Sequence, residues 1–311
     1  MTQDTIGIDI SKAFLDAHQL TTGAHARFDT TKAGFSALRK WIGDPLPDRV
    51  VYEATGRYHL PFEAAFAGQL PLVKVNPLQA RRFAQSLGTR AKTDAVDAHM
   101  LARMGQALDL IPDQPVTQEE REIKELQVAR AGITRDRTAL LNRLSAQKMG
   151  LTRRMTRLRL AQAERQIAAL DDEIERRTRS CPRKARALDI LTSIPGIGAI
   201  SARAILIECP EIGTLGAKQI AALAGVAPMT RQSGKWQGKA HIQGGRRPLR
   251  QALFMPALVA MKRNPDLAEK YTTLRAAGKP HKVALTTLMR KLIQLANTLI
   301  RQDRMWVQKH A

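Results

Sequence analysis

The feature that most constrains the fold is the order of short apolar runs in the first hundred residues. Three β-rich runs come first, with turn residues before the third, and an apolar repeat at helical spacing follows them. Two further β-rich runs then alternate with helical stretches. A meander followed by alternating helices and strands predicts an α/β domain with a mixed sheet and helices on its faces. The expected strands are residues 5–11, 13–20, 24–30, 49–55 and 71–76.

Changes in composition divide the chain into three predicted domains. The proline-bearing stretch at 110–120 ends the α/β part. From about 117 to 190 the sequence is charged and almost free of Gly and Pro, which predicts two long helices that form either a plain spacer hairpin or a dimerising coiled coil. The last third is mostly helical and closes with a helix from about Val283 to Ile300. The expected domains are residues 1–112, 113–187 and 188–311.

The net charge indicates the class of partner. Fifty Lys and Arg against 28 Asp and Glu give a formal charge of +22, which attracts polyanions over a Debye length or more. Nucleic acid is therefore the expected partner, and a merely soluble basic protein or one that adheres to anionic membrane is the alternative. No apolar run approaches 18 residues, and the N-terminus lacks a signal-peptide pattern. Two cysteines are too few for a disulfide framework, so we expect a cytoplasmic protein without a membrane span.

Four carboxylates stand at unusual positions. Asp9 interrupts the apolar run TIGIDIS, Glu53 lies near the end of VVYEAT, and Asp94 and Asp97 lie three apart at the start of a helical stretch. The helical pair alone is commonly dipole compensation, but a carboxylate buried in a strand without a partner is costly. Divalent ions between the four groups would remove that cost, because Mg²⁺ or Mn²⁺ prefers oxygen ligands. We expect these four acids to hold metal ions that polarise a phosphodiester.

Two segments of the last third are predicted to contact nucleic acid. In IPGIGAISARAIL, Gly196 and Gly198 belong to a tight turn like that of a helix-hairpin-helix, whose backbone N–H groups meet a phosphate; a purely structural turn is the alternative. The segment 228–250 has four glycines and no acid, which predicts a mobile phosphate-contacting loop rather than a solvated linker. Its basic residues are Arg231, Lys235, Lys239, Arg246, Arg247 and Arg250.

Ser233 lies in the middle of that segment, in RQSGK. A lone serine is rarely catalytic, and no nearby His or Asp supplies an obvious base. The flanking Arg231 and Lys235 could stabilise an alkoxide and the phosphate that it attacks, and metal ions could activate the hydroxyl group.

The motifs GIDISK, YEATG and KTDAVDA occur in this order, and the sequence around them resembles the RuvC-like, ribonuclease-H-fold domain of the DEDD insertion-sequence transposases, relatives of the Piv/MooV DNA invertases. The segments IPGIG, LAGVAPMTRQSGK, GGRRPLRQALFMPALVA and KPHKVALTTLMRKLI are similar to the C-terminal transposase domain of the same family. The resemblance implies that Asp9, Glu53, Asp94 and Asp97 are the metal-binding acids. It also implies that Ser233 is the nucleophile.

This resemblance implies a DNA recombinase of an insertion sequence, which cuts and rejoins donor and target DNA through a covalent phosphoserine link. It further implies a homo-oligomer, dimer to tetramer, with an active site composed from two subunits, and a non-coding bridge RNA that pairs with both DNAs. The arginine-rich helices around 150–187 are candidate RNA contacts, and aromatic residues at only 4% favour contacts to shape and phosphate. Such a protein is expected at the nucleoid.

Two other functions stay open on the sequence. A structure-specific nuclease would resolve branched DNA with metal-activated water and leave Ser233 as a bystander, so it would form no protein–DNA adduct. A non-catalytic RNA chaperone or architectural protein would tolerate the loss of Asp9 or Asp97 and would not require Mg²⁺.

Overall fold

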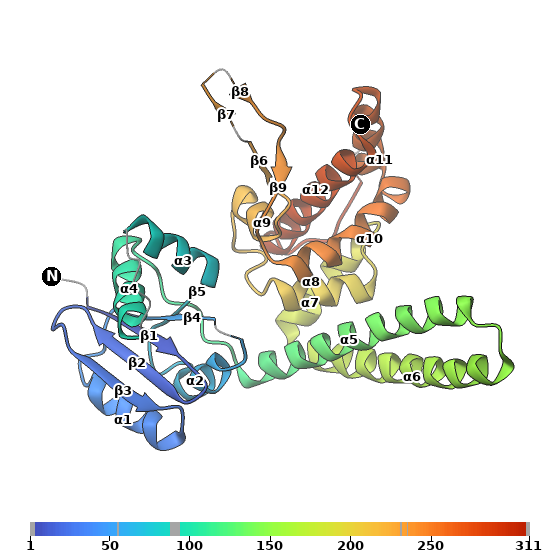
Figure 1. The fold of residues 1–311 in the computed structure, drawn as a ribbon. Coiled ribbons are helices and arrows are strands. Elements are labelled where there is room, and N and C mark those ends of the chain that lie inside the picture. Colours follow the sequence, from blue (N-terminus) through green and yellow to red (C-terminus); the bar gives the residue numbers. More distant parts are fainter. Residues whose placement is uncertain (1–3, 55, 88–93, 231, 235, 309–311) are drawn as a thin grey trace. The chain divides into compact units, whose positions relative to one another are not determined.

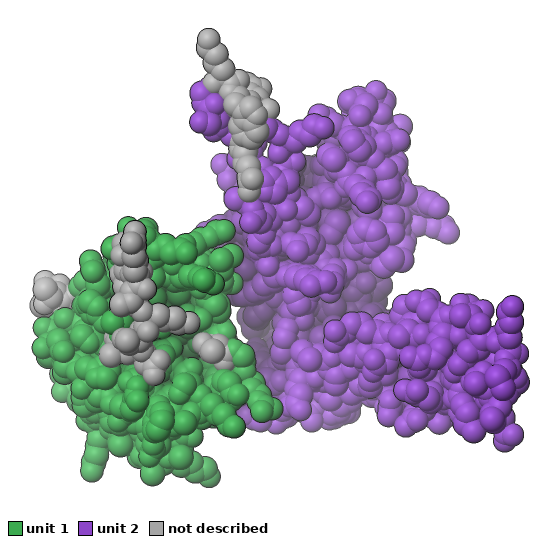
Figure 2. Space-filling model, viewed as in Figure 1, with its two compact units in different colours: residues 1–117 green, residues 118–311 purple. Residues whose placement is uncertain are grey.

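The computed structural model describes residues 4–54, 56–87, 94–230, 232–234 and 236–308 (Figure 1). The chain forms two compact units, residues 1–117 and 118–311 (Figure 2). The first contains a sheet with helices, and the second is mostly helical, which confirms the predicted α/β part and helical remainder. The division into three domains stays a prediction, since the central helices belong to the second unit.

Unit 1 is built on a five-stranded sheet with the order β3-β2-β1-β4-β5. The first three strands form an antiparallel meander, and β4 and β5 run parallel to β1. Each strand agrees with its predicted range to within two residues at either end. The strands are β1 Thr5–Ile10, β2 Phe14–Gln19, β3 His25–Asp29, β4 Arg49–Glu53 and β5 Leu72–Val75.

Helices cover both faces of this sheet (Figure 1). Because side chains alternate along a strand, Ile8 and Tyr52 pack with α1 and α2 on one face, while Val51 and Val73 pack with α3 and α4 on the other. The N-cap Thr31 accepts a hydrogen bond from the Gly34 amide and so begins α1. The helices are α1 Lys32–Ile42, α2 His59–Phe66, α3 Pro77–Ser86 and α4 Asp94–Ala107.

Unit 2 begins with a long helical hairpin. Helices α5 Gln118–Ala146 and α6 Gly150–Ser180 lie side by side (Figure 1). Arg153 closes the turn between them, since its Nη1 donates to the carbonyl oxygens of Leu144 at 3.2 Å and Gln147 at 2.8 Å. The two predicted long helices are therefore an antiparallel pair within one chain.

The rest of unit 2 is a helical body around one large apolar core. Its last helix, predicted from Val283 to Ile300, has nine buried residues, and seven of them belong to that core. Among the residues described, no helix combines the length and apolar character needed to cross a membrane. The helices are α7 Pro182–Ser193, α8 Ala199–Glu208, α9 Ala217–Leu223, α10 Arg247–Arg263, α11 Pro265–Ala276 and α12 His281–Arg301.

Candidate active site

Asp9 and Glu53 lie side by side on neighbouring strands. The parallel register of β1 and β4 pairs Ile8 with Tyr52, so the next residues along the two strands are also neighbours. Ile8 and Tyr52 face α1 and α2, and the alternation of side chains therefore turns both carboxylates toward the face that α4 covers. Both residues are half-buried. The strand register thus brings together two of the predicted acids at the carboxyl ends of their strands.

Helix α4 approaches this face closely because a glycine removes a side chain from the contact. A Cβ atom on Gly7 of β1 would lie 2.0 Å from the carbonyl oxygen of Ala98 and 2.5 Å from the amide nitrogen of Ala102. A Cβ atom on Gly105 of α4 would lie 2.5 Å from Cγ2 of Val51. Both glycines are therefore required for the helix to pack at this distance. A glycine inside the strand sequence TIGIDI is the signal that could have predicted the contact.

Arg49 of β4 fastens the C-terminal end of α4. Its Nη1 donates to the carbonyl oxygen of Gly105 at 2.8 Å and its Nη2 to Oδ1 of Asp109 at 2.8 Å, and the residue is only 4% exposed. A cation at the last carbonyls of a helix also complements the helix dipole. Since Arg49 starts β4, α4 runs antiparallel to β1 and β4. No pattern in the sequence distinguishes Arg49 from the other basic residues.

These contacts determine where the first turn of α4 lies. The turn Ala98–Ala102 covers Gly7, and the helix continues toward its N-terminus along β1. With about 1.5 Å per helical residue and about 3.3 Å per strand residue, the two strand positions from Gly7 to Asp9 correspond to roughly four helical residues. The backbone turn that holds Asp94 and Asp97 therefore lies over Asp9. Asp97 is half-buried, and the side chain of Asp94 lies outside the described residues.

The donor set suits a hard divalent cation. Asp9, Glu53 and Asp97 offer only carboxylate oxygens, the ligands that Mg²⁺ and Mn²⁺ prefer. Among the described side chains, no three His, Cys, Asp or Glu are grouped closely enough to hold a metal ion, and Asp94 is not among those side chains. The chemistry of the donors fits the predicted metal site, which stays a prediction.

An ion pair with a buried carboxylate flanks Asp9. Asp16 of β2 stands opposite Asp9 in the antiparallel register and is 2% exposed. Arg27 of β3 donates from Nε to Oδ1 of Asp16 at 3.0 Å, its Nη2 lies 3.0 Å from Oδ2, and His25 Nε2 lies 3.4 Å from Oδ1. Such partners offset the cost of burying a carboxylate. The row Arg27, Asp16, Asp9 and Glu53 thus crosses four strands, and Asp16 was not predicted although it too interrupts an apolar run.

An aromatic contact between β2 and α4 lies one row further along the sheet. The rings of His18 and His99 meet edge to face, with centroids 4.7 Å apart. Burial, and then the neighbouring His99 and His25, lower the pKa of His18. A neutral imidazole at this position is compatible with close packing of the helix.

Ser233 belongs to strand β7, near the end of a β-hairpin arm (Figure 1). It pairs with Trp236, and Gly234, which follows it, has the positive φ of 54° that a tight hairpin turn requires. Ser233 is exposed, and its hydroxyl has no hydrogen bond to another described side chain. The segment predicted as a loop is thus largely a hairpin. Its strands are β6 Pro228–Met229, β7 Gln232–Ser233, β8 Trp236–Gln237 and β9 His241–Ile242.

Arg246 precedes α10 and is engaged within the protein. It donates to the two carboxylate oxygens of Glu211 at 2.5 and 2.7 Å and to the carbonyl oxygen of Glu208 at 3.0 Å. Burial alone would raise the pKa of Glu211, but the hydrogen bonds and the positive charge of Arg246, together with further hydrogen bonds to the carboxylate, outweigh it and lower that pKa. Arg246 is therefore a structural cation, and its predicted contact with nucleic acid would compete with this pair.

The other basic residues that were predicted to contact nucleic acid differ in their exposure and in their contacts within the protein. Arg250 donates from Nη1 to the carbonyl oxygen of Gly244 at 2.8 Å and so holds the base of the hairpin arm, between β9 and α10. Lys239 and Arg247 are exposed, and Arg247 begins α10 rather than lying in a loop. Arg231 and Lys235 lie outside the described residues.

The glycines of the turn between α7 and α8 have different surroundings. Gly196 has φ 110°, and a Cβ atom there would lie 2.7 Å from Cβ of Ala260 and 2.8 Å from the carbonyl oxygen of Pro256, both in α10. Gly196 is thus required for packing. Gly198 is exposed, has open space around it and precedes α8 as its N-cap, so it is the member of the pair that stays available to a phosphate.

Comparison with known proteins gives matches over most of the chain. Residues 6–148 match a family model described as a transposase, of the DEDD type named for IS110, and residues 188–272 match that of the transposase IS116/IS110/IS902 family. The chain is 30% identical over 316 residues to the pilin gene-inverting protein of Moraxella lacunata and also to that of Moraxella bovis, with 98% of each chain covered. It is 36% identical over 115 residues to an uncharacterized 43.6 kDa protein of insertion element IS110 from Streptomyces coelicolor, across 36% of this chain and 28% of that protein. These matches confirm the resemblance that the motifs predicted.

Proposed function

This chain belongs to the IS116/IS110/IS902 family of transposases, and on that premise we propose that it recombines DNA with Ser233 as nucleophile and an acidic metal site on unit 1. The observation that supports the proposal is the parallel register that makes Asp9 and Glu53 neighbours on β1 and β4, on the face of the sheet that α4 covers. The meander, the strand order and the helix over the acids support a RuvC-like, ribonuclease-H-type fold for unit 1.

The reaction exchanges one phosphodiester for another. The Ser233 oxygen forms a bond to phosphorus while the bond from phosphorus to one deoxyribose oxygen breaks, and the proton lost by the serine is balanced by the proton gained by that deoxyribose hydroxyl. In the second step a deoxyribose hydroxyl of another strand displaces the serine. The bond energy is kept in the phosphoserine, so no external energy source is needed.

The surroundings of Ser233 suit this role. The residue stands near the end of an exposed arm, where a DNA backbone can reach its hydroxyl group. Asp9, Glu53, Asp94 and Asp97 would hold the divalent ions. When bound, Mg²⁺ or Mn²⁺ stabilises charge on the scissile phosphate and the reacting oxygens. Arg27 offsets the charge of Asp16, so this pair adds no net negative charge beside Asp9.

The relatives favour strand exchange over simple cleavage. The two Moraxella proteins are named for inverting a pilin gene, and the alignments with them cover 98% of this chain. Inversion requires rejoining as well as cutting, which a hydrolytic nuclease does not perform. We further propose that the protein acts at the nucleoid in the cytoplasm, as a dimer or tetramer with acids and serine from different subunits, and that a bridge RNA selects donor and target DNA.

The proposal is tested by the covalent intermediate. Labelled donor and target DNA are incubated with the full chain, its copurifying RNA and Mg²⁺, and the mixture is denatured and separated by electrophoresis. A labelled protein band is expected with wild-type protein, none with Ser233→Ala, and none when EDTA removes the metal. Thr230→Ala, an exposed position on the same arm, is the matched control and should still give the adduct.

The proposed metal binding by the acids is tested by a measurement other than recombination. Binding of Mn²⁺ to the protein, measured by electron paramagnetic resonance, should weaken in Asp9→Asn and Asp97→Asn and stay unchanged in Ser233→Ala. Cleaved DNA without any adduct would support the nuclease and refute the phosphoserine step. If no discrete RNA species copurifies with the protein, the proposal of a bridge RNA is refuted and the serine chemistry is unaffected.

A further inference from the structure

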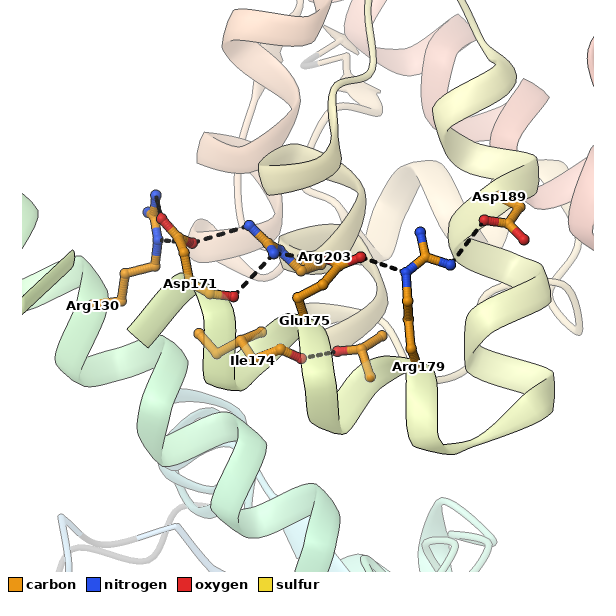
Figure 3. Close-up of polar contacts among 8 residues, drawn as sticks. Arg130, Asp171, Ile174, Glu175, Arg179, Asp189 and Arg203 are labelled. Carbon is orange, nitrogen blue, oxygen red and sulfur yellow. Dashed lines mark hydrogen bonds and ion pairs between the residues drawn. The ribbon is translucent and has the colours of Figure 1, made fainter. Parts of the chain in front are cut away.

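The charges of the α5–α6 hairpin divide into two halves. In the half next to α7 and α8, most basic side chains are held in ion pairs within the protein (Figure 3). Arg130 of α5 donates from Nε to Oδ1 of Asp171 at 2.6 Å, and Arg179 donates from Nε to Oε1 of Glu175 at 2.5 Å. Arg137 and Glu164, whose nitrogen and oxygen are 3.1 Å apart, mark the end of this half.

The distal half, residues 138–163, has the opposite character. It contains six Lys or Arg and no Asp or Glu. One of the six, Arg153, closes the hairpin turn through its bonds to main-chain oxygens. The other five are exposed, and within the part of the chain that the structure describes none of them has a hydrogen bond or ion pair to another side chain. They are Arg143, Lys148, Arg154, Arg157 and Arg159.

The distal half has the dimensions and composition of a surface for a double helix. Fourteen residues of α6, from 150 to 163, extend about 20 Å, a length that faces about six phosphates on each strand of a duplex. No Phe, Tyr, Trp or His occurs in residues 138–163, so the surface has no aromatic ring on which an unpaired base could stack. Contacts to backbone phosphates are what such a surface offers.

We infer that the distal half of the hairpin, residues 138–163, is a binding surface for the phosphate backbone of double-helical nucleic acid. The inference rests on the proposed function and adds to it a binding site separate from the serine arm and the acids. DNA and RNA duplexes share the chemistry that this surface recognises.

A second copy of the chain is the other partner to be considered, because Leu151, Met155 and Leu158 are exposed among these cations. Pairing two distal halves would bring five unpaired positive charges against five, with no acid on either side. Like charges at contact are repelled, whereas a polyanion releases counterions and gains affinity from each cation. The charge therefore favours nucleic acid.

The test uses the full chain and two probes, a DNA duplex of unrelated sequence and an RNA hairpin with a stem of equal length. Binding is followed by fluorescence anisotropy between about 50 and about 300 mM NaCl, so that the salt dependence of the affinity is measured. The double variant Arg154→Gln/Arg157→Gln should bind more weakly whatever the sequence, and the slope of log K against log salt should fall by about 2, about 1 for each lost phosphate contact. Arg154→Lys/Arg157→Lys should keep most of the slope because it keeps both charges.

The matched control is Arg135→Gln/Arg165→Gln, which removes the same charge from exposed positions in the proximal half. Its slope should stay close to that of the wild type. A fall in slope with either probe supports the inference and identifies the duplex that is bound. An unchanged slope in Arg154→Gln/Arg157→Gln overturns it, as does a change in sedimentation without a change in slope, which would indicate a second copy. These outcomes are independent of the Ser233 adduct, whose absence from wild-type protein would refute the proposed function instead.

Discussion

Arg203 of α8 and Asp171 of α6 are joined by two hydrogen bonds, from Nη1 to the main-chain oxygen at 3.0 Å and from Nη2 to Oδ1 at 3.1 Å (Figure 3). Arg203 also donates to Oε2 of Glu175 at 2.8 Å and is only 7% exposed. Asp171 accepts further bonds from Arg130 of α5. Asp171 of α6 thus joins a guanidinium group of the helical body to a guanidinium group of α5.

Replacing Arg203 with Gln should therefore destabilise unit 2. Asp171 would keep Arg130, so we expect a loss of about 2 kcal/mol in the free energy of unfolding, less than the full cost of an unpaired buried charge. Urea denaturation followed by circular dichroism measures the change. Arg176→Gln removes an exposed arginine of α6 that pairs with the neighbouring Glu173 of the same helix and should leave the midpoint almost unchanged. Equal midpoints for the two variants would contradict the structural role of Arg203.

Gly7→Ala should displace α4 from the sheet. The added Cβ would meet the main-chain oxygen of Ala98 at 2.0 Å, and a helix backbone cannot yield as a flexible side chain does. We expect a loss of about 3 kcal/mol in unfolding free energy, together with weaker Mn²⁺ binding because the turn with Asp97 moves. Gly150→Ala is the control, since a Cβ atom there has open space. A stable Gly7→Ala protein with normal Mn²⁺ affinity would show that the close approach is not needed.

The sequence predicted the sheet and two of its acids because both depend on local pattern. Alternation along each strand determines which face a residue occupies, so an acid such as Asp9 inside an apolar run is conspicuous. The position of α4 depends instead on contacts between distant segments, between Gly7 and Ala98 and between Arg49 and Gly105. No periodicity in the sequence contains that information.

The roles of the basic residues likewise depend on contacts between distant segments, which the sequence does not show. A count of Lys and Arg treats Arg246 and Arg247 alike, although they are neighbours in the chain. Only the fold brings Glu211 to Arg246 and leaves Arg247 exposed. The hairpin arm was predicted as a loop because its strands are two residues long and rich in Gly, too short for a clear alternation.

Arg246→Gln and Arg247→Gln should therefore have different effects. Loss of Arg246 leaves the Glu211 carboxylate without its bidentate partner, and we expect about 1 kcal/mol of destabilisation, as for a well-formed but partly exposed pair. Loss of the exposed Arg247 should leave stability unchanged and weaken DNA binding. Thermal unfolding and DNA titration of both variants test this. The reverse pattern, with a stable Arg246→Gln protein that fails to bind DNA, would make Arg246 a direct contact.

The Glu211 pair also predicts how stability depends on pH. Arg246 lowers the pKa of Glu211 in the folded protein below its ordinary value of 4.5, so the unfolded chain binds more protons at acid pH. The stabilising contribution is complete above about pH 4.5 and is lost as the pH falls through the lowered pKa. Wild type should be more stable than Glu211→Gln near neutral pH, and the difference in urea midpoint should shrink below pH 4.5. Glu125→Gln, an exposed position of α5, serves as control, and a difference for Glu211→Gln that grows toward acid pH would exclude this pair as its source.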